Sequence, residues 1–192
     1  MAWLAAYLAA SLPCLLLLVG WSIPGGDILA GLGAIALAMP IALVWFVGFA
    51  ILAFKQRGRF GFTQLARWLG IPLAGVLTLA LLAAGLPLRA RFELSRAALE
   101  DVARRVQAGE TLRDSTPAGW YTIDGAYVDD EDGGVYLPVE GSGLFTDCGF
   151  LYLPTGQPMA SRQMWFAPID GPWWTFERRN SDDPIVRVAS NP

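Results

Sequence analysis

The feature that most constrains this chain is an N-terminal stretch that is almost free of charge. Between Met1 and Phe54 the only charged side chain is Asp27, whereas sixteen of the seventeen acidic residues follow Leu88. A water-soluble domain normally carries about 25% charged residues, but this chain of 192 residues carries 16%. The uneven distribution predicts a membrane-embedded half followed by a water-soluble half.

Three apolar runs in the first half are long enough to cross a bilayer, which takes about 20 apolar residues. They cover residues 2–21, 28–54 and 69–88. Pro40 lies near the middle of the second run, and proline is tolerated inside membrane helices. The first run lacks a basic start and a small-residue cleavage site, so we interpret it as a retained span. The sequence therefore predicts three transmembrane helices within residues 1–88.

The orientation of these spans is indicated by the basic residues of the short loops. The turn at 22–27 has none, whereas the loop at 55–67 contains Lys55, Arg57, Arg59 and Arg67. We therefore expect this loop in the cytoplasm, with its basic residues facing anionic lipid headgroups. The N-terminus is then cytoplasmic and the C-terminal half extracytoplasmic, in a multi-pass protein of the cell membrane.

The second span carries a small residue at every fourth position, namely Ala30, Ala34, Ala38 and Ala42. Such a row allows another helix to approach closely in a membrane. The partner is either another span of this chain or another membrane protein. None of the spans contains a charged side chain, which argues against a self-contained transporter or pump.

The pattern of residues 89–110 predicts a juxtamembrane amphipathic helix. The segment FELSRAALEDVARRVQ starts at Phe92, and Ser95 is expected to cap the helix N-terminus. Its apolar stripe consists of Leu99, Val102, Ala103 and Val106. Gly109 lies where a helix would end.

Residues 111–180 change to a period of two, which is typical of strands. Five short runs alternate with Gly-, Pro- and Asp-rich turns: WYTIDGAYV, VYLPV, CGFLYLP, RQMWFAP and WWTFER. The expected fold is thus three transmembrane α-helices followed by a small α+β extracytoplasmic domain, with one helix and an antiparallel sheet of about five strands. Residues 181–192 are expected to form a flexible tail.

The β-rich module is unusually aromatic, and most of its rings are expected to fill a small core. Trp173 lies on the other side of its strand from Trp174 and Phe176, so we expect it to be exposed for contact with a ligand. Cys14 and Cys148 are expected to lie too far apart to pair. Cys148 is expected to be a buried thiol.

The stretch YVDDEDGGVYL at 127–137 looks like a cation-binding loop. Asp129, Glu131 and Glu140 supply carboxylates, but the spacing fails for an EF-hand loop, and strands flank it. Asp-Gly between alternating apolar runs is a strong hairpin signal. We favour a hairpin tip, with a weak divalent-cation site at these three acids as the alternative.

The strings GWYTI, CGFLYLPTGQP and DGPWWTFE resemble the C-terminal regions of small, uncharacterised bacterial membrane proteins. In those proteins a few spans precede an outer domain with Gly-Phe-x-Tyr-x-Pro and Gly-Pro-Trp strings. The resemblance covers about residues 91–178. It implies the same architecture and carries over no activity, ligand or catalytic residue.

The composition narrows the possible functions. The chain has no histidine, which removes the commonest general base and metal ligand, and the acidic second half disfavours a nucleic-acid partner. No cofactor is expected. Three hypotheses stay open: a membrane-tethered module for binding or envelope organisation, an accessory subunit that docks through the alanine row, and a hydrolase using Asp124, Asp129 and Glu140. The expected partners are the lipid bilayer and another membrane protein or a component of the cell envelope.

Overall fold

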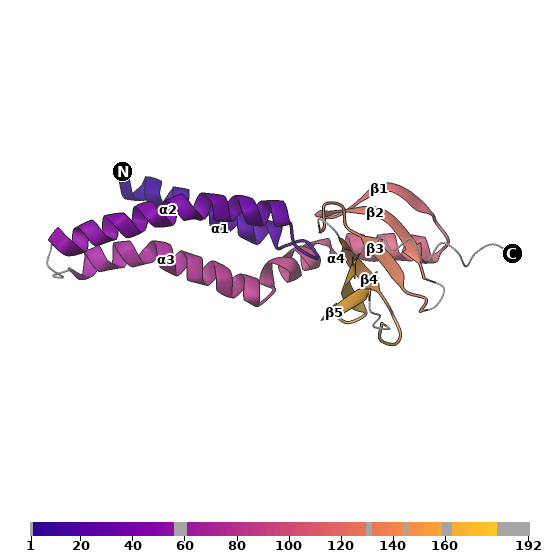
Figure 1. Ribbon diagram of the computed structural model, residues 1–192. Coiled ribbons are helices and arrows are strands. Elements are labelled where there is room, and N and C mark those ends of the chain that lie inside the picture. The colour runs from indigo at the N-terminus through magenta and orange to yellow at the C-terminus, as the bar shows by residue number, and fades with distance from the viewer. Residues whose placement is uncertain (1, 56–60, 130–131, 144–145, 159–162, 180–192) are drawn as a thin grey trace. The chain divides into compact units, whose positions relative to one another are not determined.

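The computed structural model describes residues 2–55, 61–129, 132–143, 146–158 and 163–179. The chain divides into two compact units, Met1–Glu93 and Leu94–Pro192. We call them the helical unit and the sheet unit, after the elements that Figure 1 shows in each. The described residues form four helices and a six-stranded antiparallel sheet.

The helical unit is built from α1 (Ala2–Gly20), α2 (Ile28–Lys55) and α3 (Phe62–Ala83). By length and composition, α2 and the Leu65–Ala83 part of α3 could each cross a membrane, and Ala6–Gly20 of α1 is a shorter apolar helix. In the described part of the chain α1 packs against both α2 and α3. The first helix is therefore the common neighbour of the other two.

The single charged residue of the first 54 positions caps a helix. The Oδ1 atom of Asp27 accepts hydrogen bonds from the backbone N–H groups of Leu29 and Ala30, at 2.9 and 3.1 Å. These bonds satisfy donors that the first turn of α2 leaves unpaired. The adjoining turn is tight, because a Cβ on Gly20 would lie 2.7 Å from the Cβ of Ala30. Asp27 thus fixes the N-terminus of α2 after the turn that follows α1.

The structure corrects the predicted loop 55–67 and the third span at 69–88. Helix α3 already begins at Phe62, so Arg67 lies inside it, and α3 ends at Ala83. The helix stops because Gly85 adopts φ 64°, a conformation that suits glycine at a helix end. Pro87 then falls in the first turn of α4 (Leu86–Gln107), where proline is tolerated. Arg57 and Arg59 lie outside the described residues.

Helix α4 also differs from the prediction at its start. It begins at Leu86, so Ser95 lies inside the helix and is not its cap. Instead, the buried Oγ of Ser95 accepts a hydrogen bond from the backbone N–H of Trp120 at 2.9 Å. The predicted apolar stripe is confirmed, since Leu99, Val102, Ala103 and Val106 are all buried. Gly109, with φ 92°, follows the helix end.

The sheet has the strand order β1-β2-β3-β4-β6-β5. Its strands are β1 (Leu112–Ala118), β2 (Tyr121–Val128), β3 (Val135–Pro138), β4 (Thr146–Tyr152), β5 (Met164–Asp170) and β6 (Trp173–Arg179). The sequence predicted about five strands and missed β1. Its sequence LRDSTPA is polar and contains Pro117, which a sheet accepts in an edge strand.

A β-bulge at Gly125 decides which residues of β2 are buried. Ile123 pairs with Val139, whereas Tyr127 pairs with Tyr136, so the register shifts by one residue between them. Gly125 has φ 70°, as a glycine bulge requires. Because a one-residue shift exchanges the two faces, Ile123 and Ala126 are both buried.

Both faces of the sheet bury apolar side chains. On one face, which we call the Phe150 face, Tyr121 packs edge-on against Phe150 at 4.9 Å between ring centroids. On the other, the Tyr136 face, Tyr136 packs against Phe176 at 5.3 Å. Leu151 and Leu153 complete the buried cluster on the Tyr136 face.

The part of α4 that belongs to the sheet unit is tied to both edges of the sheet. Ser95 accepts the bond from Trp120 in the β1–β2 turn, and its neighbour Arg96 forms an ion pair with Asp170 at the end of β5. In a flat sheet of six strands the two edges would lie about 24 Å apart. Since adjacent helix residues reach both, the sheet must curl around the first turns of α4 within the sheet unit.

Candidate functional site

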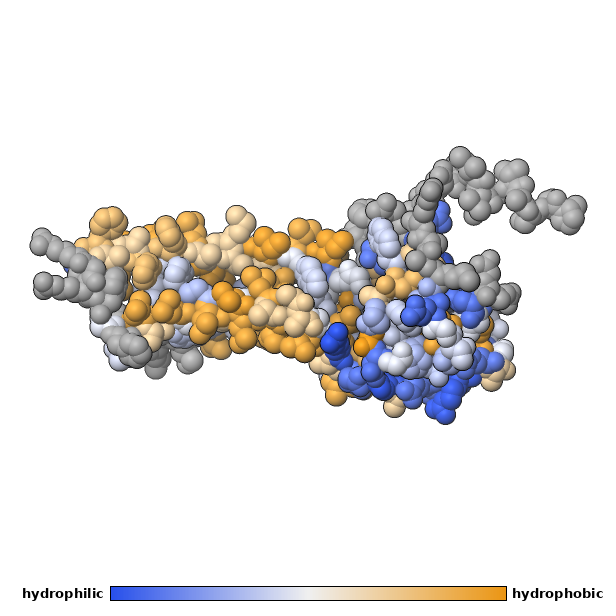
Figure 2. All heavy atoms as spheres, turned by 90° about the horizontal axis from the view of Figure 1, so that it is seen from below, coloured by the Kyte–Doolittle hydropathy of each residue, from blue (hydrophilic) through white to orange (hydrophobic). Residues whose placement is uncertain are grey.

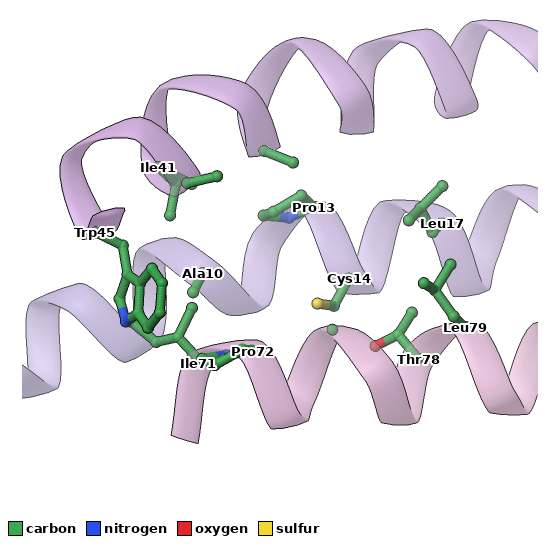
Figure 3. A pocket seen from close by; sticks show the side chains of 13 residues that line it. Ala10, Pro13, Cys14, Leu17, Ile41, Trp45, Ile71, Pro72, Thr78 and Leu79 are labelled. Carbon is green, nitrogen blue, oxygen red and sulfur yellow. The ribbon is translucent and has the colours of Figure 1, made fainter. Parts of the chain in front are cut away.

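The helical unit contains two adjoining apolar cavities, and we call the pair the interhelical hollow. The first has a volume of about 390 Å³ and the second about 510 Å³, with Ile41, Trp45 and Ile71 lining both. Figure 3 shows side chains of all three helices pointing into the first cavity. They are Ala10, Pro13, Cys14 and Leu17 of α1, Ala38, Ile41, Ala42 and Trp45 of α2, and Ile71, Pro72, Gly75, Thr78 and Leu79 of α3.

The hollow arises from the contrast between large rings and small residues. Trp45 stacks on Phe49 at 5.6 Å between ring centroids, and both rings lie about 6 Å from Trp68 of α3. These bulky rings keep the backbones of α2 and α3 apart at that level. Further along the helices Ala38, Ala42 and Gly75 are too small to close the resulting gap.

A proline explains how the ring cluster is anchored. Pro72 has no N–H, so the carbonyl of Trp68, four residues earlier, loses its usual helical donor. The indole Nε1–H of Trp45 donates to this carbonyl at 3.0 Å. On the adjacent residue, the hydroxyl of Tyr7 donates to the carbonyl of Arg67 at 2.7 Å. Side chains of α1 and α2 therefore each bond the backbone of α3.

The predicted alanine row is divided between two roles. Ala34 is fully buried and Ala30 abuts Gly20 of α1, so this part of the row serves packing inside the chain. Ala38 and Ala42 instead line the hollow. The sequence left open whether the row contacts its own chain or another protein, and the structure assigns its first half to its own chain.

The chemistry available in the hollow is apolar. None of the residues that line the two cavities carries a charge. The hydroxyl of Thr78 donates to the carbonyl of Ala74 at 2.9 Å, and Cys14 is half-buried. Such a lining suits an apolar ligand, and it offers no general acid, general base or set of metal ligands.

In the sheet unit, the acidic stretch is a hairpin turn, as favoured from the sequence. The N–H of Asp129 donates to the carbonyl of Gly134 at 3.0 Å, between β2 and β3. The carboxylate of Asp132 is bound within the turn, because it accepts bonds from the N–H of Gly134 at 2.8 Å and from the hydroxyl of Tyr136 at 3.0 Å. Asp132 thus stabilises the turn rather than pointing freely into solvent.

The structure does not bring together the two described acids of the alternative cation site, Asp129 and Glu140. Glu140 pairs with Thr122, and Asp129 lies at the opposite end of β2. Seven residues of strand separate the two levels by about 23 Å. Glu131 lies outside the described residues. Among the residues described, no three His, Cys, Asp or Glu side chains could hold a metal ion together.

The carboxylates considered for hydrolysis are not assembled into one site. Asp124 and Glu140 share a face and are diagonal neighbours across β2 and β3, which places them about 7–8 Å apart. Both are exposed. Asp129 lies beyond the far end of β2, so the predicted set of three carboxylates does not converge.

The prediction that Trp173 is exposed is wrong. Its side chain is only 1% exposed, and its ring lies 4.9 Å from that of Tyr152, directly opposite on β4. Among the described residues of the sheet unit, the exposed tryptophans are Trp165 on β5, at 53%, and Trp120 in the β1–β2 turn, at 66%. Trp165 lies on β5, an edge strand of the sheet that pairs with β6.

A second aromatic cluster holds the end of β2 against β6. Tyr127 stacks on Tyr136 with ring centroids 5.2 Å apart, and Arg178 donates a hydrogen bond to the Tyr127 hydroxyl. Burial raises the pKa of Tyr127, and burial with the hydrogen bond to Asp132 raises the pKa of Tyr136 far above its usual value. Both phenols therefore stay protonated in the folded unit, as structural groups.

The thiol of Cys148 is expected to be unreactive while the sheet unit is folded. It is buried in β4, and burial raises its pKa, so little thiolate forms near neutral pH. In a Cys14→Ala chain, iodoacetamide at pH 8 should modify Cys148 at least tenfold more slowly in the native protein than in urea. Equal rates in the two states would contradict this packing.

The two candidate sites thus differ in kind. The hollow is an apolar cavity in the helical unit, and the sheet unit presents two exposed tryptophans beside a buried aromatic core. The resemblance drawn from short sequence strings stays a prediction. Comparison of the chain with protein-family models, with curated proteins and with solved structures gives no match.

Proposed function

We propose that this chain is a multi-pass integral membrane protein that displays a small β-rich module outside the cytoplasm for binding or envelope organisation. The observation that carries the proposal is the exposure of large apolar side chains along α1, α2 and α3. No residue in the most apolar window of α2 is buried. Figure 2 shows the helical unit as a largely hydrophobic surface. Soluble proteins rarely expose apolar patches above a few hundred Å².

The apolar surface is distributed over all three helices. Exposed side chains include Leu12, Leu15 and Val19 of α1, Leu29, Leu43 and Val44 of α2, and Leu73, Val76 and Leu79 of α3. At 1.5 Å per residue, the 19 residues of α1 extend for about 28 Å, close to the bilayer core of about 30 Å. This supports α1 as a third span beside α2 and α3.

The basic residues support a cytoplasmic position for the α2–α3 end of the unit. Lys55 ends α2 and Arg67 lies in the second turn of α3, and both are exposed. Trp45, Phe49 and Trp68 form an aromatic cluster on the same two helices. Basic residues next to an aromatic layer are typical of the cytoplasmic membrane interface.

A binding role for the module is supported by its exposed Trp120 and Trp165. Tryptophan is enriched at binding surfaces, where it supplies contact area at low entropic cost. Ala30 and Ala34 pack inside the chain. Of the alanine row, the accessory-subunit hypothesis can therefore use only Ala38 and Ala42 to dock on another protein. The display function therefore has the broader support.

Membrane extraction and cysteine labelling test this proposal. The full chain should stay in the membrane pellet after alkaline carbonate, whereas release into the supernatant would refute it. In a chain without native cysteines, Thr155→Cys should react with an impermeant maleimide in intact cells. Thr63→Cys should react only after permeabilisation, and the reverse pattern would overturn the orientation. Both threonines are exposed and lie at opposite ends of the proposed topology.

A further inference from the structure

We propose that the interhelical hollow is a binding site for an acyl chain of an anionic phospholipid, with the headgroup at the Arg67 end. The site deepens the proposed membrane function and rests on it. The hollow lies in the helical unit alone, and residues of α1, α2 and α3 line it (Figure 3).

The lining selects a hydrocarbon occupant. It contains no charged residue, and its one hydroxyl, on Thr78, already donates to the Ala74 carbonyl at 2.9 Å. A buried water needs two to four polar partners and is not retained in an apolar cavity. In a bilayer, the apolar molecules that surround the protein are lipids, and their hydrocarbon chains can occupy such a cavity.

The length of the lining fits one acyl chain. The lining residues extend over Ala6–Leu17, Ala38–Gly48 and Trp68–Leu79, which corresponds to about 15–16 Å along each helix axis. That length is half of a hydrocarbon core of about 30 Å, the depth of one leaflet. An extended acyl chain also reaches through one leaflet, so the lining of the two cavities, of about 390 and 510 Å³, matches such a chain in length.

The charge at one end of the hollow selects the headgroup. Trp68 lines the cavity, and Arg67 directly precedes it with its side chain exposed. Lys55 lies at the end of α2, seven residues beyond Gly48 of the lining. The Arg67 carbonyl is held by Tyr7 and the Trp68 carbonyl by Trp45, so this turn of α3 is fixed by both neighbouring helices. Cationic side chains at this depth attract anionic headgroups.

The chain-binding part can be tested by filling the first cavity. Ala42→Phe places a ring in the lining, whereas Ala36→Phe adds the same ring to an exposed position of α2 outside the lining. The full protein, purified in detergent with added phosphatidylglycerol, is analysed by native mass spectrometry. The native chain and Ala36→Phe should each retain one lipid, and Ala42→Phe should retain at least fivefold less.

The location of the chain can be read from photolabelling. In vesicles that contain phosphatidylglycerol with a diazirine on the acyl chain, the lining residues Ala10, Cys14 and Thr78 should be labelled in the native protein, with the label assigned to single residues by fragmentation. The label on these residues should fall at least fivefold in Ala42→Phe and stay unchanged in Ala36→Phe. Equal labelling of all three proteins would overturn the site. Absence of label on these residues in the native protein would overturn it as well.

The headgroup part is tested by comparing lipids with identical chains. Native protein should bind phosphatidylglycerol at least fivefold better than phosphatidylcholine, and Arg67→Gln should remove this preference while chain labelling persists. An unchanged preference in Arg67→Gln would overturn the role of Arg67. These failures are distinct from failure of the proposed function, because a protein that does not enter vesicles would yield no label on exposed α2 residues such as Leu43 either.

Discussion

Replacing Trp173 by alanine is expected to lower the free energy of unfolding of the sheet unit by about 3–5 kcal/mol, the usual cost of truncating a buried tryptophan. The side chain is 1% exposed and packs against Tyr152, its partner across β4 and β6. Phe150 of β4, on the same face of the sheet, is fully buried as well. The surrounding sheet therefore has little freedom to close the cavity.

The loss can be measured through Cys148, whose thiol is buried in β4. In a Cys14→Ala chain kept in detergent, the urea concentration at which Cys148 becomes reactive reports unfolding of the sheet unit. Trp165→Ala is the matched control, since its ring is 53% exposed on β5. This change should cost less than about 1 kcal/mol. Equal effects of the two substitutions would contradict the burial assigned to Trp173.

The same residue shows how far strand periodicity can be trusted. The alternation in WWTFER correctly places Trp173 on the face opposite Trp174 and Phe176, because side chains alternate in any strand. It does not tell which face is covered, and in this sheet both faces carry buried aromatic rings. The burial of Trp173 depends on Tyr152, which is 21 residues earlier in the chain. Such a pairing is set by the fold and not by the local sequence.

For the helices, the periodicity of apolar residues predicted the buried face of α4 correctly, whereas hydropathy misplaced the end of α3. The stripe from Leu99 to Val106 is buried as predicted, because a helix repeats its contacts every three or four residues. The end of α3 was misplaced, since Leu86 and Leu88 continue the apolar run beyond the break at Gly85. Hydropathy cannot separate two consecutive apolar helices. In the sequence, Gly85 itself was the better indicator of the end of α3, because glycine readily adopts the positive φ found there.

The interhelical hollow could not be predicted, because it depends on how three helices approach one another. The sequence does contain one correlated feature: Pro13, Pro40 and Pro72 lie inside α1, α2 and α3, and each lines one of the two cavities. A proline removes one helical hydrogen bond and disturbs local packing. Its structural consequence is visible only at Pro72, where the indole of Trp45 replaces the missing donor.

Replacing Trp45 by phenylalanine is expected to destabilise the helical unit by about 1–3 kcal/mol, the cost of leaving a buried acceptor unsatisfied. The change keeps an aromatic ring beside Phe49 and Trp68 but removes the N–H that bonds the Trp68 carbonyl at 3.0 Å. In a bilayer or micelle, water does not replace this donor. Loss of helical circular dichroism in a titration with SDS measures the change in stability of the full chain.

The cause can be isolated by restoring the missing backbone donor. Pro72→Ala returns an N–H to position 72, four residues after Trp68, so the carbonyl regains its helical partner. In the Pro72→Ala chain, Trp45→Phe should therefore cost less than half of what it costs in the native chain. The difference between the two costs is the coupling energy between the indole and the proline. Identical costs in both backgrounds would show that Trp45 stabilises the unit only by ring packing, and the hydrogen bond to Trp68 would then contribute nothing measurable.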